Sequence, residues 1–295
     1  MRTRDTNPID IEQYLADRKR IIDGALDRIL PLPDTYPSSI HQAMRYSVLG
    51  DGKRFRPILA CAVFEAMNGT NGMIMEAACA LELIHAYSLI HDDLPCMDDD
   101  DLRRGKPTLH KAFNEAVAVL AGDALSALAF ELLAATERPD IIREVARAIG
   151  PQGMVGGQVV DIQSEGKPFV SEEVEYIHSH KTGALITVAA RVGAMLAGAG
   201  PQELSALTVY GEKMGLAFQI VDDILDLEGK LETLGKKPGS DLCKKKATYP
   251  SVVGLEESKK RAEELIRLAI ETLSPFGAPA TPLQEIARFI LTRTY

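Results

Sequence analysis

Apolar and polar positions recur along the chain at the three-to-four-residue spacing of α-helices, and the strict alternation typical of half-buried strands is nearly absent. Gly and Pro separate the periodic stretches. The pattern predicts helices at residues 10–30, 38–49, 56–67, 72–93, 110–136, 139–164, 171–198, 202–228, 256–273 and 282–292. Loops are expected at 50–52, 69–72 and 234–250. The sequence therefore indicates an all-α fold.

Several predicted helices are apolar almost all round, for example residues 77–90, which is typical of helices at the centre of a large domain. The most membrane-like stretch, 116–135, carries Asp123 and Glu131, so it is predicted to be a buried helix and not a membrane span. No linker rich in Pro, Ser or Gly divides the chain. We expect one all-α domain over residues 1–295.

Composition narrows the partners and the compartment. Of 295 residues, 46% are hydrophobic, which supports a sizeable core, and the formal net charge of −9 argues against nucleic acid as a partner. The four cysteines form no Cys-x-x-Cys pair, so reduced thiols and no zinc site are expected. The N-terminus has no apolar signal segment. A cytoplasmic protein without a membrane span is predicted.

Two aspartate clusters each close a strongly hydrophobic run. The first spans residues 92–98 (DDLPCMD) and the second spans residues 222–226 (DDILD). Carboxylates are almost never fully buried unless they are paired or bind a metal. Small groups of hard oxygen ligands suit Mg²⁺, which binds through one or two carboxylates together with phosphate oxygens and water. The clusters predict a Mg²⁺-dependent site for a phosphorylated substrate.

Helix geometry sets how each cluster presents its carboxylates. Asp222 and Asp226 are four residues apart and share a helix face, and Gln219 is placed on the same stripe. Asp92 and Asp98 would lie about 120° apart on a continuous helix. Pro95 lacks an N–H group and disfavours the helical region for the residue before it. We therefore predict a break at residues 94–97 that returns Asp98 to the side of Asp92.

Upstream of the break, Leu81, His85, Ser88 and Asp92 form one helical stripe, so His85 and Ser88 should line the same cavity as Asp92. Basic residues accompany both clusters, and facing aspartates would repel one another unless cations and a polyanion lay between them. Arg offers a fork that matches a diphosphate, and Lys offers a point charge. The basic residues are Lys53, Arg54 and Arg56 before a helix, Arg103 and Arg104 after the first cluster, Lys181 beside Thr182, and Lys236, Lys237, Lys244, Lys245 and Lys246 after the second. Taken singly, each cluster and each basic run is also typical of a solvated helix end, and their repeated proximity is what favours a phosphate site.

The chain resembles the trans-isoprenyl diphosphate synthases, most closely those of the bacterial farnesyl diphosphate type. The motifs that carry the resemblance occur in family order: LGDGKRFRP (49–57), ELIHAYSLIHDDLPCMDDDDLRRGKPTLH (82–110), AGDAL (121–125), GGQVVDI (156–162), HKTGALI (180–186), GLAFQIVDDILD (215–226) and GKKPGSDLCKKKATYP (235–250). Asp51 departs from the glycine that is usual in the family, and it leaves Lys53 and Arg56 in place.

The resemblance implies an all-α prenyltransferase fold with a deep central cavity, a homodimer, and three Mg²⁺ ions. By the same resemblance, Asp92 and Asp98 would hold two ions and Asp222 the third, with Asp93 and Asp226 in support. Contacts to the allylic diphosphate would come from Arg103, Lys181, Thr182, Gln219, Lys236 and Lys246. Isopentenyl diphosphate would bind at Gly52, Lys53, Arg56, His85 and Arg104.

The implied reaction ionises the allylic diphosphate, condenses the resulting cation with isopentenyl diphosphate, and then loses a proton. Water must be excluded because it would quench the cation. Product length should depend on residues one turn below Asp92, namely Tyr87 and Ser88. The resemblance associates a bulky residue at Tyr87 with a C15 product, although helix geometry places Tyr87 about 140° from Asp92. A farnesyl diphosphate synthase is therefore expected.

Three alternatives remain at this stage. A geranylgeranyl diphosphate synthase differs only at the cavity floor. A terpene cyclase needs a second metal motif with Ser and Glu, whereas this chain has Leu225 and Asp226 there. A non-catalytic subunit of a heteromeric synthase is expected to lose the aspartates or the basic loop, and this chain keeps both.

Overall fold

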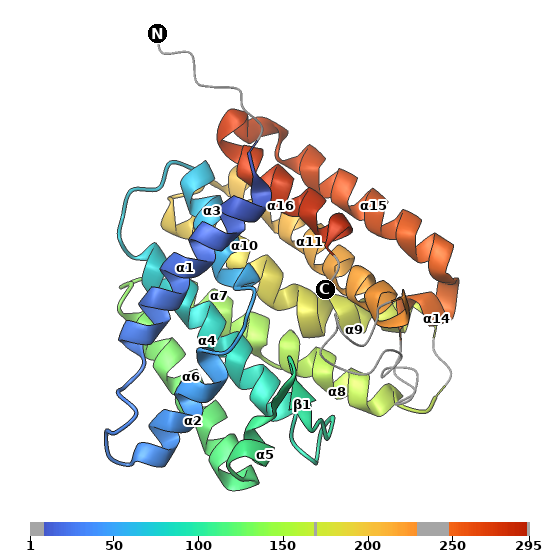
Figure 1. Ribbon diagram of the computed structural model, residues 1–295. Coiled ribbons are helices and arrows are strands. Elements are labelled where there is room, and N and C mark those ends of the chain that lie inside the picture. The colour runs from blue at the N-terminus through green and yellow to red at the C-terminus, as the bar shows by residue number, and fades with distance from the viewer. Residues whose placement is uncertain (1–8, 168–169, 229–247, 294–295) are drawn as a thin grey trace.

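Helices form nearly all of the regular structure (Figure 1). The computed structural model describes residues 9–167, 170–228 and 248–293. The α-helices are α1 (Ile11–Ile29), α2 (Ser38–Val48), α3 (Phe55–Ala66), α4 (Ile74–Asp92), α5 (Leu109–Ala112), α6 (Glu115–Ala134), α7 (Pro139–Ile149), α8 (Met154–Ser164), α9 (Ser171–Ile177), α10 (Ala184–Leu196), α11 (Pro201–Glu228), α14 (Tyr249–Val253), α15 (Leu255–Thr272) and α16 (Thr281–Thr292). The predicted all-α fold is confirmed.

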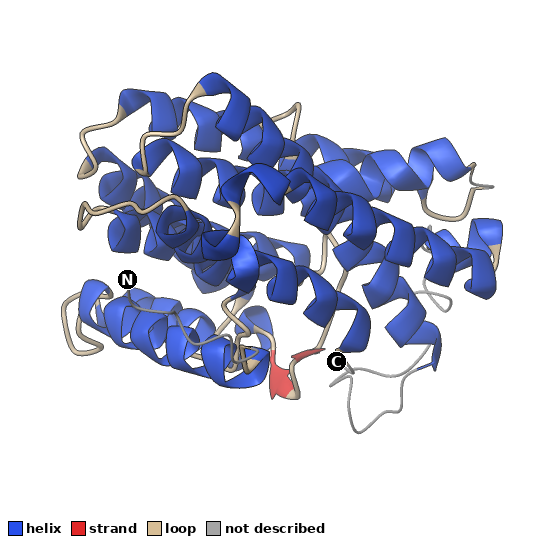
Figure 2. Ribbon diagram, turned by 90° about the horizontal axis from the view of Figure 1, so that it is seen from above, coloured by secondary structure: helices blue, strands red, loops and turns tan. Residues whose placement is uncertain are grey.

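The central helices are those whose sequences are apolar on every side. All residues from Ala77 to Ile84 in α4 are buried, and so are most residues of α3 and α10. Around them the amphipathic helices bury one stripe each. Figure 1 shows α15 and α16 on the side of the molecule away from α2 and α5. Figure 2 shows the same helices from above, with the short strands at the edge of the molecule. The buried apolar side chains form one cluster. The division of the chain into one domain stays a prediction.

Two helices predicted as continuous are broken. The predicted helix 110–136 divides into α5 and α6, because Asn114 is extended and its side chain accepts a hydrogen bond from Val117 N (2.9 Å), which caps a new helix. The predicted helix 139–164 divides into α7 and α8 at residues 150–153. This segment contains Pro151 and two glycines, which end helices readily. The loop predicted at 234–250 extends too far, because Tyr249 and Pro250 begin α14. The part of this loop at residues 234–247 lies outside the described residues.

The predicted helix 171–198 contains a π-helical segment, η1 (His178–Gly183), between α9 and α10. Such segments widen one helical turn and occur most often at functional sites. Two close contacts accommodate it. A Cβ on Gly157 of α8 would lie 2.3 Å from Lys181 N, and one on Gly215 of α11 would lie 2.6 Å from Gly183 Cα. The periodicity of the sequence gives no sign of this bulge.

Helix α6 is half-buried, in contrast to the buried helix predicted at 116–135. Its buried positions lie on one stripe, namely Ala118, Ala121, Gly122, Leu125, Ala129 and Leu133. Val119 and Leu120 on the opposite side are exposed. Among the described residues, α6 is the one helix long and apolar enough to cross a membrane, and 33% of its most apolar window is buried.

Two short strands complete the fold. β1 (Leu102–Arg103) and β2 (Lys106–Pro107) pair antiparallel after α4, with Arg104 and Gly105 at positive φ in the turn. Tyr46 Oη of α2 donates to Pro107 O (2.8 Å), which attaches the hairpin to the helical body. The hairpin therefore holds Arg103 and Arg104 near the end of α4.

Candidate active site

The first aspartate cluster breaks α4 as predicted. The helix ends at Asp92, and the chain then turns so that Asp98 N donates to Asp92 O (2.8 Å). Asp99 N and Met97 N both donate to Leu94 O, so the backbone that Pro95 frees is bonded again within the turn. The predicted return of Asp98 to the side of Asp92 is confirmed.

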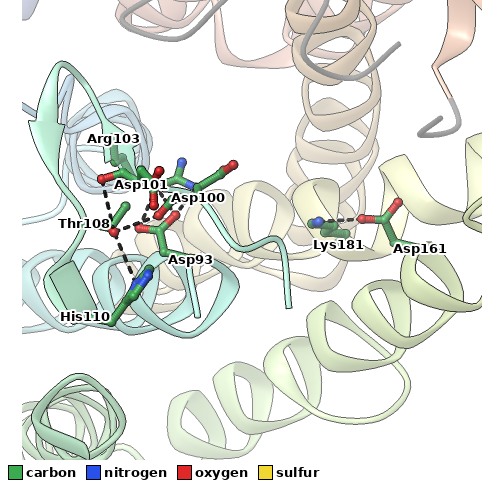
Figure 3. A network of polar contacts seen from close by, with 8 residues as sticks. All are labelled: Asp93, Asp100, Asp101, Arg103, Thr108, His110, Asp161 and Lys181. Carbon is green, nitrogen blue, oxygen red and sulfur yellow. Dashed lines mark hydrogen bonds and ion pairs between the residues drawn. The ribbon is translucent and has the colours of Figure 1, made fainter. Parts of the chain in front are cut away.

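Asp93 binds an arginine of the hairpin. Its buried carboxylate accepts two hydrogen bonds from Arg103 Nε (2.7 and 3.0 Å) and one from Nη2 (2.5 Å). Thr108 Oγ1 donates to Asp100 O (2.7 Å) and contacts His110 Nδ1 (3.2 Å), as Figure 3 shows. These bonds fix the loop after Asp92 and orient Arg103. Asp93 therefore supports the site indirectly, because its carboxylate binds and orients Arg103.

Lys181 lies on the opposite side of the site from this loop (Figure 3). Its Nζ forms an ion pair with Asp161 of α8 at 2.6 Å, and both side chains are largely buried. Burial opposes the lysine charge, but Asp161, Asp92 and Asp98 outweigh it and raise the pKa of Lys181. Lys181 therefore stays protonated and lies within the electrostatic reach of the first aspartate cluster.

The second cluster separates its three carboxylates. Asp222 is partly exposed and binds Arg293 at 2.8 Å, whereas Asp223 and Asp226 are buried. Within α11, Gln219 Nε2 donates to Asp223 Oδ1 (3.0 Å) four residues on, while the stripe of Gln219 with Asp222 stays a prediction. Asp222 is the carboxylate of this cluster that reaches solvent.

A chain of hydrogen bonds links η1 to α11. Thr182 Oγ1 donates to Gln219 Oε1 (2.7 Å), and Gln219 in turn donates to Asp223. The second oxygen of Asp223 accepts from Tyr249 N (2.8 Å) and lies 3.2 Å from His178 Nε2. Each member is held by the next, so Thr182 and Gln219 have fixed orientations. Because Lys181 precedes Thr182, the lysine that couples electrostatically to Asp92 and Asp98 is adjacent to the residue that bonds to α11.

A group of cationic and imidazole side chains lies beside Asp222. Partial burial and the nearby Arg293 and Arg104 lower the pKa of Lys53 to about 8, against the opposing effect of Asp222. Burial lowers the pKa of Arg56 to about 10, and its Nε has no hydrogen-bond partner among the described residues. Burial and four surrounding arginines hold the pKa of His85 well below its usual value. The excess positive charge favours an anion such as a diphosphate.

The helix face below Asp92 divides into two stripes. By helical spacing Ser88 lies on the stripe of His85 and Asp92, and its Oγ donates to the backbone His85 O (2.9 Å). Tyr87 packs edge-on against His91, with ring centroids 5.9 Å apart, and His91 Nε2 contacts Val119 O of α6 (3.2 Å). Tyr87 therefore faces α6 and flanks the stripe of Asp92. The predicted deep central cavity stays a prediction.

Residues 37–274 match the polyprenyl synthetase family. The chain belongs to the polyprenyl synthetase family. It is 46% identical to a heterodimeric geranylgeranyl pyrophosphate synthase large subunit of Arabidopsis thaliana, over 99% of this chain and 82% of that protein. It is also 46% identical to a geranylgeranyl diphosphate synthase of Cyanophora paradoxa, over 95% of each chain. Membership makes this protein a trans-prenyltransferase of isoprenoid biosynthesis that elongates prenyl diphosphates.

Solved structures of related synthases have the same fold as this chain. An FPP/GFPP synthase of Zymomonas mobilis superposes with a TM-score of 0.85 at 39% identity, covering 96% of this chain and 99% of that one. A geranyltransferase of Helicobacter pylori, solved with magnesium and isoprenyl diphosphate, gives 0.82 at 32% identity, with 98% of both chains covered. The two curated relatives are thus named as geranylgeranyl diphosphate synthases, whereas the two solved structures are named as an FPP/GFPP synthase and a geranyltransferase.

Sequence reasoning missed several residues of this polyprenyl synthetase site. Arg293 is 71 positions from Asp222 and stands in a short terminal segment, so no spacing could connect them. Asp161 lies within the motif GGQVVDI (156–162), but its pairing with Lys181 depends on the bulge at η1. Gly52 is explained by packing, since a Cβ there would lie 2.5 Å from Arg54 Nη1. The predicted ligands Lys236 and Lys246 lie outside the described residues.

The carboxylates fit a divalent cation shared with a ligand. Within the described residues, no three His, Cys, Asp or Glu side chains converge into a complete metal site. Asp92 and Asp98 share one turn, and Asp222 is set on α11 beyond η1. Mg²⁺ prefers such incomplete oxygen sets, because it retains water and binds the phosphates of its substrate.

Proposed function

We propose that the protein condenses isopentenyl diphosphate head-to-tail with allylic diphosphates, starting from dimethylallyl or geranyl diphosphate. One observation carries the proposal: the excess of positive charge at Lys53, Arg56 and Arg104 lies beside Asp222, while Lys181 couples electrostatically to Asp92 and Asp98. The two environments suit two diphosphates of different kinds. One would be held directly by cations and the other through metal ions.

Three Mg²⁺ ions are proposed for the allylic diphosphate, with Asp92 and Asp98 holding two and Asp222 the third. When bound, they would neutralise the charge that develops on the departing diphosphate. Asp93 would orient Arg103 toward the same phosphates, and Asp226 would support the second cluster. Lys181 supplies a fixed positive charge from the other side, because its ion pair with Asp161 holds Nζ in place.

The proposed reaction needs correctly positioned substrates and the exclusion of water, and it needs no side-chain nucleophile. The oxygens of Thr182 and Gln219 are held by the chain that ends on Asp223, so their dipoles can face the allylic cation. We propose that His85, Lys53, Arg56 and Arg104, with Gly52 at the loop, hold isopentenyl diphosphate so that its double bond attacks that cation. The released diphosphate would accept the proton that is lost. Lys236 and Lys246 are proposed to contact the allylic diphosphate.

For the product, we propose geranylgeranyl diphosphate, the C20 allylic diphosphate. Curated relatives that share 46% of their residues with this chain carry that name. The position of Tyr87 is compatible with it, because the ring faces His91 and α6 and does not lie on the stripe below Asp92.

Farnesyl diphosphate, C15, is the second candidate, and it was the expectation from the sequence. The bulk of Tyr87 favours it, as does the similarity in fold to an FPP/GFPP synthase. Both candidates share the chemistry and differ only in where elongation stops.

Incubation of the purified protein with Mg²⁺, isopentenyl diphosphate and dimethylallyl diphosphate tests the proposal. The products are separated by chain length. A C20 product supports the first candidate, and a C15 product supports the second. The absence of any elongated product would overturn the proposed reaction.

We further propose that the enzyme works as a homodimer in the cytoplasm. The exposed apolar side of α6, with Val119 and Leu120, supports a second copy of the chain as its cover. Cys61, Cys79 and Cys96 are free thiols, which suits a reducing compartment.

A further inference from the structure

Arg54 belongs to the basic loop, but its guanidinium points into the protein. Its side chain is 3% exposed. Nε donates to Asp23 Oδ1 (2.7 Å), Nη1 donates to Glu82 Oε1 (2.7 Å), and Nη2 donates to Val48 O (2.7 Å) and Gly50 O (3.0 Å). Each terminal nitrogen of the fork therefore has a protein partner.

These bonds attach the loop to three helices at once. Asp23 lies on α1, Val48 ends α2, and Glu82 lies on α4. Arg54 itself caps α3 in the left-handed region, with φ of 54°, which is uncommon outside glycine and persists only where the surroundings impose it. The side-chain bonds supply that constraint. They fix the backbone between Lys53, which precedes Arg54, and Arg56 in the first turn of α3.

Arg54 also neutralises the buried acid nearest to the cations. Glu82 is 3% exposed. Its charge opposes the lowering of the pKa values of Arg56 and Arg104 by burial, but its ion pair is with Arg54. Glu82 precedes His85 by one helical turn. Because Arg54 takes the carboxylate, Arg56 keeps an Nε without a partner among the described residues. An anion that enters the site meets cations that Glu82 has not already satisfied.

We propose that Arg54 is a positioning residue for the subsite of isopentenyl diphosphate. It fixes Lys53 and Arg56 relative to His85, and it occupies Glu82 so that Arg56 can bind the diphosphate. The proposal rests on the proposed function, since it needs that substrate at these cations. Lysine cannot replace Arg54, because a single ammonium group cannot reach Asp23, Glu82 and the two carbonyls together.

Steady-state kinetics of Arg54→Lys test the inference. The KM for isopentenyl diphosphate is expected to rise by about tenfold or more, and the KM for the allylic diphosphate to change by less than about twofold. Arg18→Lys is the matched control. Arg18 also links α1 to α3, through Glu65 at 2.7 Å, but it lies outside the loop, and its variant should leave both KM values unchanged.

The outcomes separate two failures. If the wild-type protein does not elongate, the proposed function fails. If the wild type elongates and folded Arg54→Lys keeps both KM values, or raises both equally, the inference is wrong. Circular dichroism establishes that the variant is folded. Should Arg54→Lys not fold, Asp23→Asn carries the same test, because it weakens the anchor of Arg54 Nε and leaves Glu82 charged, and the same selective rise in KM is expected.

Discussion

At the scale of single residues, environment separates chemically similar groups into different roles. Arg54 is satisfied on every side, Arg103 is bound to Asp93, and Arg56 keeps a buried nitrogen without a partner among the described residues. The aspartates differ in the same way, since Asp223 orients Gln219 while Asp222 reaches solvent. The sequence shows which residue types are present, and the side-chain partners of each residue in the fold decide what it can bind.

The lowered pKa of Lys53 predicts a pH dependence for substrate binding. Lys53 is protonated below about 8 and loses its charge as the pH rises through that value, while Lys in an unfolded chain stays charged to well above it. The KM for isopentenyl diphosphate should therefore rise between about pH 7 and pH 9. In Lys53→Gln, the KM should be higher at pH 7 and this rise should vanish. An equal rise in the variant would assign the titration to another group.

Tyr87 provides a test of the cavity floor. Tyr87→Ala removes a ring that flanks the stripe of Asp92. Under the C15 candidate the product distribution should shift to longer chains than those of the wild type, and under the C20 candidate it should stay the same. Chromatography of the dephosphorylated products measures the shift. An unchanged distribution would exclude Tyr87 from the floor.

At the scale of elements, glycines set how closely helices approach the site. Gly157→Ala would place a methyl group 2.3 Å from Lys181 N and push α8 away from η1. We expect a loss of about 2–3 kcal/mol in the free energy of unfolding, together with reduced kcat. Gly24→Ala in α1 is the control, because its nearest neighbour is Arg28 Nη1 at 3.5 Å. Gly24→Ala should be neutral or slightly stabilising. Equal destabilisation by the two variants in chemical denaturation would contradict the close packing at η1.

Comparison of the predicted and observed elements shows which features the sequence alone can predict. The helix break at Pro95 and the return of Asp98 follow from the geometry of proline, and they were predicted correctly. The bulge at η1, the breaks at Asn114 and Gly150, and the ion pair between Asp222 and Arg293 were missed. Each depends on tertiary contacts or on a single capping bond, and neither alters the apolar periodicity from which helices are predicted. Local rules thus recovered the elements and the clusters, while the pairings between clusters came from the fold.

At the scale of the whole molecule, the exposed apolar side of α6 predicts self-association. Leu120 is 57% exposed on a helix whose charged residues are Glu115, Asp123 and Glu131. Leu120→Glu should convert a dimer into a monomer in analytical ultracentrifugation. Leu32→Glu is the control, since Leu32 is 66% exposed in a loop and should leave the assembly unchanged. A wild-type monomer, or a dimer that survives Leu120→Glu, would contradict the proposed role of this face.

We propose that the architecture as a whole brings carboxylates from α4 and α11 to one site, with cations on either side. The central claim is that both aspartate clusters hold one diphosphate through Mg²⁺. Calorimetric titration with inorganic pyrophosphate, with and without Mg²⁺, tests it most directly in the wild type, Asp92→Asn and Asp222→Asn. We predict binding that requires Mg²⁺ and that weakens by about tenfold or more in each variant. Binding of equal strength without Mg²⁺, or in either variant, would contradict the account.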